Sequence, residues 1–145
     1  MIKVYQTRFG GMDAPKKEQG NCFQACVASL LEIPLESAFD CTRHGEHIDG
    51  LPVEKQSWYI SFNEWLAKFG LASIYLPHYP VQLTEIDDYY IVVVKSTTLK
   101  HRNHCVIIRN GKLAHDPNPK SRAKGSDILG VYILIPLDVA KAKLT

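Results

Sequence analysis

The chain has 145 residues, of which 46% are hydrophobic and 22% charged, with a formal net charge of +2. This length predicts one domain, residues 1–145, that can bury a core without disulfides or a metal. No stretch approaches the ~18 apolar residues of a membrane span, the first residues lack a secretory signal, and the charge is too small to indicate nucleic-acid binding. We therefore expect a cytoplasmic protein that binds neither membranes nor nucleic acids.

The first half of the chain predicts two helices. Residues 2–7 alternate as a short strand, and a loop rich in glycine and charge follows over 9–17. A helix should begin near Cys22, because its apolar residues recur at intervals of three and four until Pro34 ends it. After a long polar loop over 39–56, Ser57 can cap a second helix that Gly70 ends. The expected shared apolar face of this helix comprises Trp58, Phe62, Trp65, Leu66 and Phe69.

The second half of the chain predicts strands, because short runs rich in Val, Ile and Tyr alternate there with turn residues. The expected strands are 71–76, 89–95, 104–109, 112–116 and 131–135. Helices followed by strands favour the α+β class, with the helices packed on an antiparallel sheet of about four to six strands.

The most informative residue is Cys22, which follows a Gly-Asn breaker at the predicted helix start. The first turn of a helix offers unpaired N–H groups and a partial positive charge, and both favour a thiolate. His104 opens a later strand, and Asp116 ends the next one. Cysteine-dependent acyl transfer needs a nucleophilic thiolate, a histidine that acts as base and acid, and a group that orients the histidine. These roles would fall to Cys22, His104 and Asp116 in that order.

The hairpin that joins His104 to Asp116 tests this hypothesis by its geometry. A two-residue turn at Asn110 and Gly111 would send Asp116 to the face opposite His104. A three-residue loop from Arg109 to Gly111 would set His104 directly across from Asp116 on one face. We predict the three-residue loop.

These motifs are similar to those of a known family. The runs Asn21 to Leu31, His104 to Ile108 and His115-Asp116-Pro117 resemble the papain-like cysteine peptidases. They are most similar to the double-glycine bacteriocin-processing peptidases, whose pattern is Asp-Cys-Gly-Pro-Ala-Ala, a later His before apolar residues, and a final Asp-Pro. The Gly-Asn-Cys-Phe-Gln-Ala-Cys start also resembles small bacteriophage proteins. The resemblance implies a papain-like fold, thiol hydrolase chemistry and no cofactor, but it does not name a substrate. We expect a peptide or protein substrate, and the host cytoplasm as the location if the protein is encoded by a phage.

These peptidases also place a glutamine about six residues before the nucleophile, where it stabilises the oxyanion. Here that position is Lys16, so the candidates become Gln19 first and Gln6 second. Gln24 replaces a residue of the peptidase Gly-Pro pair and is a third candidate for the oxyanion or substrate site. The Cys22 backbone N–H is a further donor.

Other cysteines and histidines offer alternatives to these assignments. Cys26 fits a buried small residue, and it is also the alternative nucleophile, because in papain the second cysteine of a similar run is catalytic, although the spacing here is one residue too long. Cys105 should be a buried residue that alternates away from His104, and His115 should face away from Asp116.

A zinc site is a further possibility in the long loop. Cys41, His44 and His47 sit three residues apart there, with Asp40, Glu46 or Asp49 as a fourth ligand. Structural zinc sites commonly show a second pair of ligands, and none follows at a suitable distance. We therefore expect no metal.

The leading functional hypothesis is a hydrolase that cleaves a peptide or isopeptide bond through an acyl-enzyme. A peptidoglycan amidase or a thiol acyltransferase would use the same residues. The alternative from another class is a catalytically silent papain-like binding protein, such as a phage product directed at a host factor. Nucleic-acid binding through the basic loops near Lys100 and Lys120 is the least favoured hypothesis.

Overall fold

The computed structural model describes residues 1–11, 13–42, 58–96, 103–120 and 128–138. Within them, two helices precede five strands: α1 (Cys22–Leu31), α2 (Trp58–Ala67), β1 (Leu71–Leu76), β2 (Tyr89–Lys95), β3 (Asn103–Arg109), β4 (Lys112–His115) and β5 (Ile128–Pro136). The strands form one antiparallel sheet in the order β1-β5-β2-β3-β4. This confirms the α+β class, and β1 and β2 have the predicted bounds. In the described ranges no helix has the length and apolar character to cross a bilayer.

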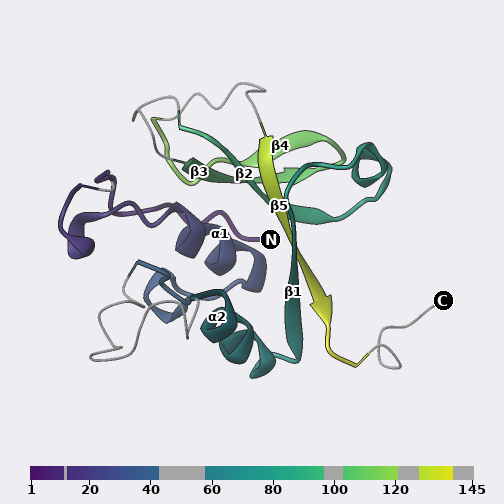
Figure 1. The fold of residues 1–145 in the computed structure, drawn as a ribbon, viewed down its shortest axis with the longest axis horizontal. Coiled ribbons are helices and arrows are strands. Elements are labelled where there is room, and N and C mark those ends of the chain that lie inside the picture. Colours follow the sequence, from purple (N-terminus) through teal and green to yellow (C-terminus); the bar gives the residue numbers. More distant parts are fainter. Residues whose placement is uncertain (12, 43–57, 97–102, 121–127, 139–145) are drawn as a thin grey trace.

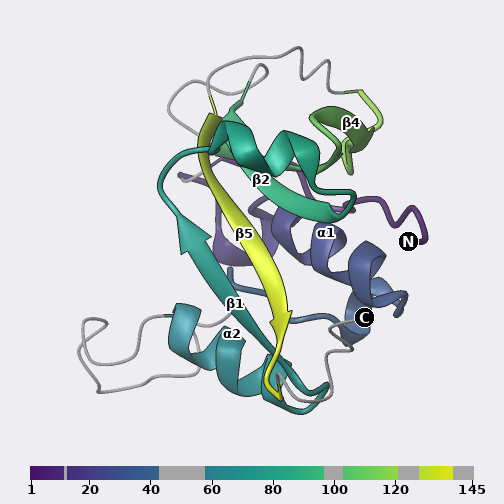
Figure 2. The same cartoon turned by 90° about the vertical axis from the view of Figure 1, so that its right-hand side faces the viewer.

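Both helices lie on the same side of the sheet, where the main core forms (Figure 1). Alternate residues of β2 and β3 belong to this main core, namely Ile91 and Val93 of β2 and Cys105 and Ile107 of β3. The residues between them face a second cluster, built around Leu83 of the short 3-10 helix η5 (Val81–Glu85). Strands β2 and β3 are therefore covered on both faces, which explains their continuous apolar runs. Figure 2 shows β5 running between β1 and β2.

The first helix is buried on every side. All residues from Cys22 to Ser29 are buried, so the helix has no solvent-facing stripe over this span and is more enclosed than its spacing predicted. It ends at Leu31, because Glu32 takes a left-handed conformation (φ 56°) and its N–H, like that of Ile33, donates to the Ala28 carbonyl. Pro34 lies two residues beyond this left-handed residue.

The second helix packs mainly through its middle turn. Phe62 and Leu66 are completely buried, as predicted, and Phe62 contacts the rings of Phe23 and Trp65. Phe69 lies past the helix end and is 46% exposed, so it does not belong to the core. The predicted cap Ser57 lies outside the described residues.

The predicted strand at residues 2–7 is absent from the structure. This segment runs extended beside α1, where the Ile2 N–H donates to the Ser29 carbonyl and the Val4 N–H donates to the Ser29 hydroxyl. The Gln6 N–H donates to the Pro117 carbonyl at 3.0 Å. None of these three N–H groups donates to the backbone of a strand, so alternation alone misidentified the segment.

Candidate active site

Cys22 occupies the first position of α1, as the sequence predicted. The preceding residue, Asn21, makes no side-chain cap on the helix, because its Oδ1 accepts hydrogen bonds from the N–H groups of Thr7 and Arg8 at 3.0 and 2.9 Å. The positive end of the helix dipole is thereby left to the Cys22 side chain. Cys22 is 8% exposed and lines a cavity. A thiolate is therefore favoured here, at the wall of a cavity.

His104 and Asp116 are hydrogen-bonded to each other. The Nε2–H group of His104 donates to Oδ1 of Asp116 at 2.7 Å, and the Asn118 N–H donates to the same oxygen at 2.9 Å. The carboxylate is thus held by the turn that follows β4. Because Asp116 takes Nε2, the other ring nitrogen, Nδ1, is left for Cys22, whose side chain is also hydrogen-bonded to His104.

The hairpin that joins these two residues has a two-residue turn, so the predicted three-residue loop was wrong. Asn110 and Gly111 both have positive φ, at 52° and 72°, as a type I′ turn requires. The extra residue lies in β4 instead. A bulge there separates the pair Ile108–Leu113 from the pair Ile107–His115.

A two-residue turn was expected to send Asp116 to the face opposite His104, but the bulge brings it back to the same face. Without it, Asp116 would face away from His104. With it, continuing the register past Ile107–His115 sets Asp116 across from Val106, which lies two residues from His104 on the same face of β3. The two side chains therefore meet diagonally rather than directly opposite one another.

The surroundings favour a Cys22 thiolate paired with a His104 imidazolium. The largest cause that lowers the pKa of Cys22 is a hydrogen bond from the Cys105 side chain. Burial acts in the opposite direction, but the hydrogen bond and the charge of His104 lower the pKa further. The pKa of Cys22 therefore lies well below its usual value. Burial alone would lower the pKa of His104, but hydrogen bonds with Asp116 and Cys22 raise it to about 9. The ion pair therefore persists between the lowered pKa of Cys22 and a pH of about 9.

Cys105 is the residue of this site that the sequence did not reveal. It is buried, as predicted, but its side chain is hydrogen-bonded to Cys22 and it lines the same cavity. Strand alternation does turn it from the His104 side of β3 to the face that α1 covers. The sequence did not show that the start of α1 packs beside Cys105 on that face of β3.

The cavity in front of Cys22 has a volume of about 450 Å³. Its lining is largely apolar and includes the aromatic residues Phe23, Trp58 and Tyr132 together with the polar residues Gln19 and Asn103. Concave sites with a few polar groups are typical of ligand pockets. This cavity has room for a ligand beside the thiol.

The three candidate glutamines have different positions. Gln19 lines the cavity of Cys22, although its amide also donates to the Ala14 carbonyl at 3.1 Å. Gln6 is buried and its amide donates to the Arg8 carbonyl. Gln24 does not point at Cys22, because its amide donates to the carbonyls of Leu35 and Ala38, so its proposed site role was wrong. Of the three, only Gln19 lines this cavity.

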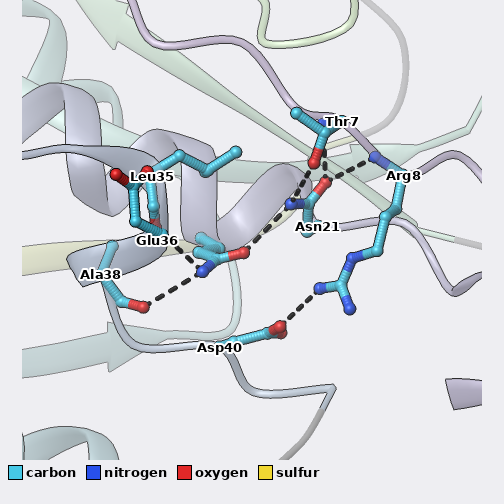
Figure 3. Close-up of a pocket in the computed structure, with 8 residues that line it drawn as sticks. Thr7, Arg8, Asn21, Leu35, Glu36, Ala38 and Asp40 are labelled. Atoms are coloured by element: carbon cyan, nitrogen blue, oxygen red, sulfur yellow. Dashed lines mark hydrogen bonds and ion pairs between the residues drawn. The ribbon is translucent and has the colours of Figure 1, made fainter. Parts of the chain in front are cut away.

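Gln24 and Asn21 line a second cavity of about 360 Å³ (Figure 3). There Arg8 forms an ion pair with Asp40 at 2.5 Å, and the Asn21 amide donates to the Thr7 hydroxyl and to Gln24. The side chains of Arg8, Asn21 and Gln24 are thus engaged, although Nη1 of Arg8 is buried without a hydrogen-bond partner among the described residues. They anchor the segment before Cys22 to the loop after α1.

The remaining candidates do not form a competing site. Cys26 is completely buried, and burial followed by the charge of Cys22 raises its pKa well above the usual value, so it is a poor nucleophile. His115 faces away from the site, as expected, and donates to the Val4 carbonyl at 2.7 Å. Of the proposed zinc ligands, Cys41 lines the Cys22 cavity, whereas His44 and His47 lie outside the described residues. The described residues contain no cluster of three side chains that could hold a metal.

Comparisons with protein-family models, with curated proteins and with solved structures found no match for this chain.

Proposed function

We propose that this protein is a thiol hydrolase that cleaves a peptide or isopeptide bond in a peptide or protein substrate, without a cofactor. The observation that carries the proposal is the hydrogen-bonded chain from Cys22 through His104 to Asp116. This is the arrangement that nucleophile, base and orienting group need in thiol acyl transfer. The resemblance of the surrounding motifs to papain-like peptidases supports the same chemistry.

In the first half of the reaction, the Cys22 sulfur attacks the carbonyl carbon and the carbonyl π electrons move to oxygen. The Cys22 N–H and the amide of Gln19 are the donors proposed for that oxyanion. As the intermediate collapses, the carbon–nitrogen bond breaks and His104 gives its proton to the leaving amine. The product is a thioester on Cys22.

In the second half, neutral His104 takes a proton from water, whose oxygen attacks the thioester carbon. The carbon–sulfur bond then breaks, the acid product leaves, and the thiolate–imidazolium pair is restored. Asp116 stays ionised and keeps the ring oriented, with Nε2 facing the carboxylate. All four cysteines are free thiols, which suits a reducing compartment, and we assign the protein to the cytoplasm on that basis.

A thiol-directed probe tests this proposal. At pH 6, iodoacetamide bearing a reporter group should label Cys22 of the wild type, and Cys22→Ser should abolish that labelling. His104→Ala should slow it at least about tenfold, because an ordinary thiol is almost entirely protonated at this pH. The matched control is His78→Ala, since His78 is exposed and should not affect the rate. Labelling that ignores His104 would oppose the hydrolase and favour the silent binding protein.

A further inference from the structure

Cys105 lies beside the nucleophile, and catalysis as described gives its thiol no bond to make or break. Its side chain is hydrogen-bonded to Cys22, and its backbone makes a second hydrogen bond to the same thiol. Both cysteines line one cavity, one from the start of α1 and the other from β3. Two sulfurs that share a hydrogen bond need only a short approach to form a disulfide.

We propose that Cys22 and Cys105 form a reversible disulfide under peroxide, which turns the active site off and protects the nucleophile from irreversible oxidation. This inference rests on the proposed function for its consequence, because only a nucleophilic Cys22 loses activity when it is bridged. It assigns Cys105 as the resolving thiol, which attacks the first oxidation product of Cys22.

The chemistry balances with hydrogen peroxide as the oxidant. The Cys22 thiolate attacks one peroxide oxygen, the oxygen–oxygen bond breaks, and hydroxide leaves and takes a proton to become water, which leaves a sulfenic acid on Cys22. The Cys105 sulfur then attacks the Cys22 sulfur. The sulfur–oxygen bond breaks, and the departing hydroxide takes the Cys105 proton as a second water. Peroxide gains two electrons, and the pair of thiols loses them.

The first oxidation step also prepares Cys105 for the second. In the reduced protein the hydrogen bond to the Cys22 thiolate is the main cause that raises the pKa of Cys105, with burial second. A sulfenic acid carries no such negative charge, so this cause disappears when Cys22 is oxidised. Cys105 is thus held as a thiol until the reaction needs its sulfur as a nucleophile.

Two other thiols lie near Cys22 and fit the resolving role less well. Cys41 lines the same cavity, whereas Cys105 is hydrogen-bonded to Cys22 through both its side chain and its backbone. Cys26 lies one helical turn further along α1 and is completely buried. The structure therefore favours one pair among the possible ones.

Disulfide mapping tests the inference on the full chain. The reduced protein is treated with a small excess of hydrogen peroxide, free thiols are blocked, and the unreduced digest is analysed by mass spectrometry. We expect the Cys22 peptide joined to the Cys105 peptide, together with loss of iodoacetamide labelling that dithiothreitol fully restores. A bridge from Cys22 to Cys41 or Cys26, or no bridge, would overturn the inference.

Two variants test whether Cys105 is the resolving thiol. In Cys105→Ser, Cys22 should proceed to sulfinic acid, and labelling recovered by dithiothreitol should fall at least tenfold below the wild type. Cys41→Ser should retain the Cys22–Cys105 bridge and the recovery. Equal recovery in Cys105→Ser and the wild type would contradict the role of Cys105. The wild-type map requires no variant to fold, and it is independent of the His104 dependence of labelling, so failure of this inference is distinguishable from failure of the proposed function.

Discussion

The substitution Asp116→Asn should lower the pKa of His104. It removes one negative charge with little change of shape, and the asparagine oxygen can still accept the hydrogen bonds of His104 and Asn118. The hydrogen bond with Asp116 is the largest cause that raises the pKa of His104 from 6.5 to about 9, followed by the contributions of Cys22. Since it is the largest of the causes that raise this pKa, its loss should lower the pKa by about one unit, which corresponds to about 1.4 kcal/mol.

The assay is an NMR titration of the His104 ring in isotope-labelled protein. The wild type should titrate near pH 9, and Asp116→Asn should titrate at least about one unit lower. The matched control is Asp87→Asn, because Asp87 is an exposed carboxylate that pairs with Arg109 and not with the site. If the His104 titration is the same in Asp116→Asn and in the wild type, the assigned role of Asp116 is refuted.

The same pair predicts a pH dependence of stability. A histidine whose pKa is raised on folding stabilises the folded state fully below its unfolded pKa of about 6.5, and the contribution is lost as the pH rises through about 9. Asp116→Asn should therefore reduce the free energy of unfolding by roughly 1–2 kcal/mol at pH 6 and by less at pH 10. Urea unfolding at the two pH values measures the difference, and an equal loss at both would contradict the linkage.

Further predictions concern the core, the hairpin turn and the oxyanion site. Phe62→Ala should destabilise the fold by about 3–5 kcal/mol in urea unfolding, whereas its matched control Phe69→Ala should cost under ~1 kcal/mol, because Phe62 is completely buried and Phe69 is 46% exposed. Gly111→Ala should cost about 1 kcal/mol in the same assay, since φ at this position is 72°. Gln19→Ala should weaken inhibition by a peptide aldehyde, which forms an oxyanion on Cys22, but leave alkylation by iodoacetamide unchanged; equal effects on both would deny Gln19 the oxyanion role.

Local signals in the sequence were sufficient for the bounds of two strands and for the position of Cys22. Residues 71–76 and 89–95 were predicted with their observed bounds, because turn residues flank dense runs of β-branched and aromatic residues. The Gly-Asn breaker placed Cys22 at the first position of α1. Features decided by packing were harder: the segment 2–7 alternates like a strand, yet its backbone N–H groups at Ile2, Val4 and Gln6 donate to α1 and to the loop after β4.

The hairpin geometry that places Asp116 beside His104 was also only partly predictable from the sequence. The sequence indicated that one extra residue must sit between them for their side chains to share a face, but not whether the turn or the strand would hold it. Asn110-Gly111 is the preferred pair for a two-residue type I′ turn, and that local preference decided the turn. The bulge in β4 has no comparable signature in the sequence, nor has the approach of α1 that brings Cys22 to Cys105.

The most direct test of the central claim is to trap the acyl-enzyme. The wild type would be incubated with a diverse peptide mixture, quenched in acid and digested, and the Cys22 peptide examined by mass spectrometry. We predict an added acyl group on Cys22 that hydroxylamine releases, as a thioester requires, and that is absent in His104→Ala. An acyl group carried by Cys41 instead, or one on Cys22 that forms equally well without His104, would contradict the proposed mechanism.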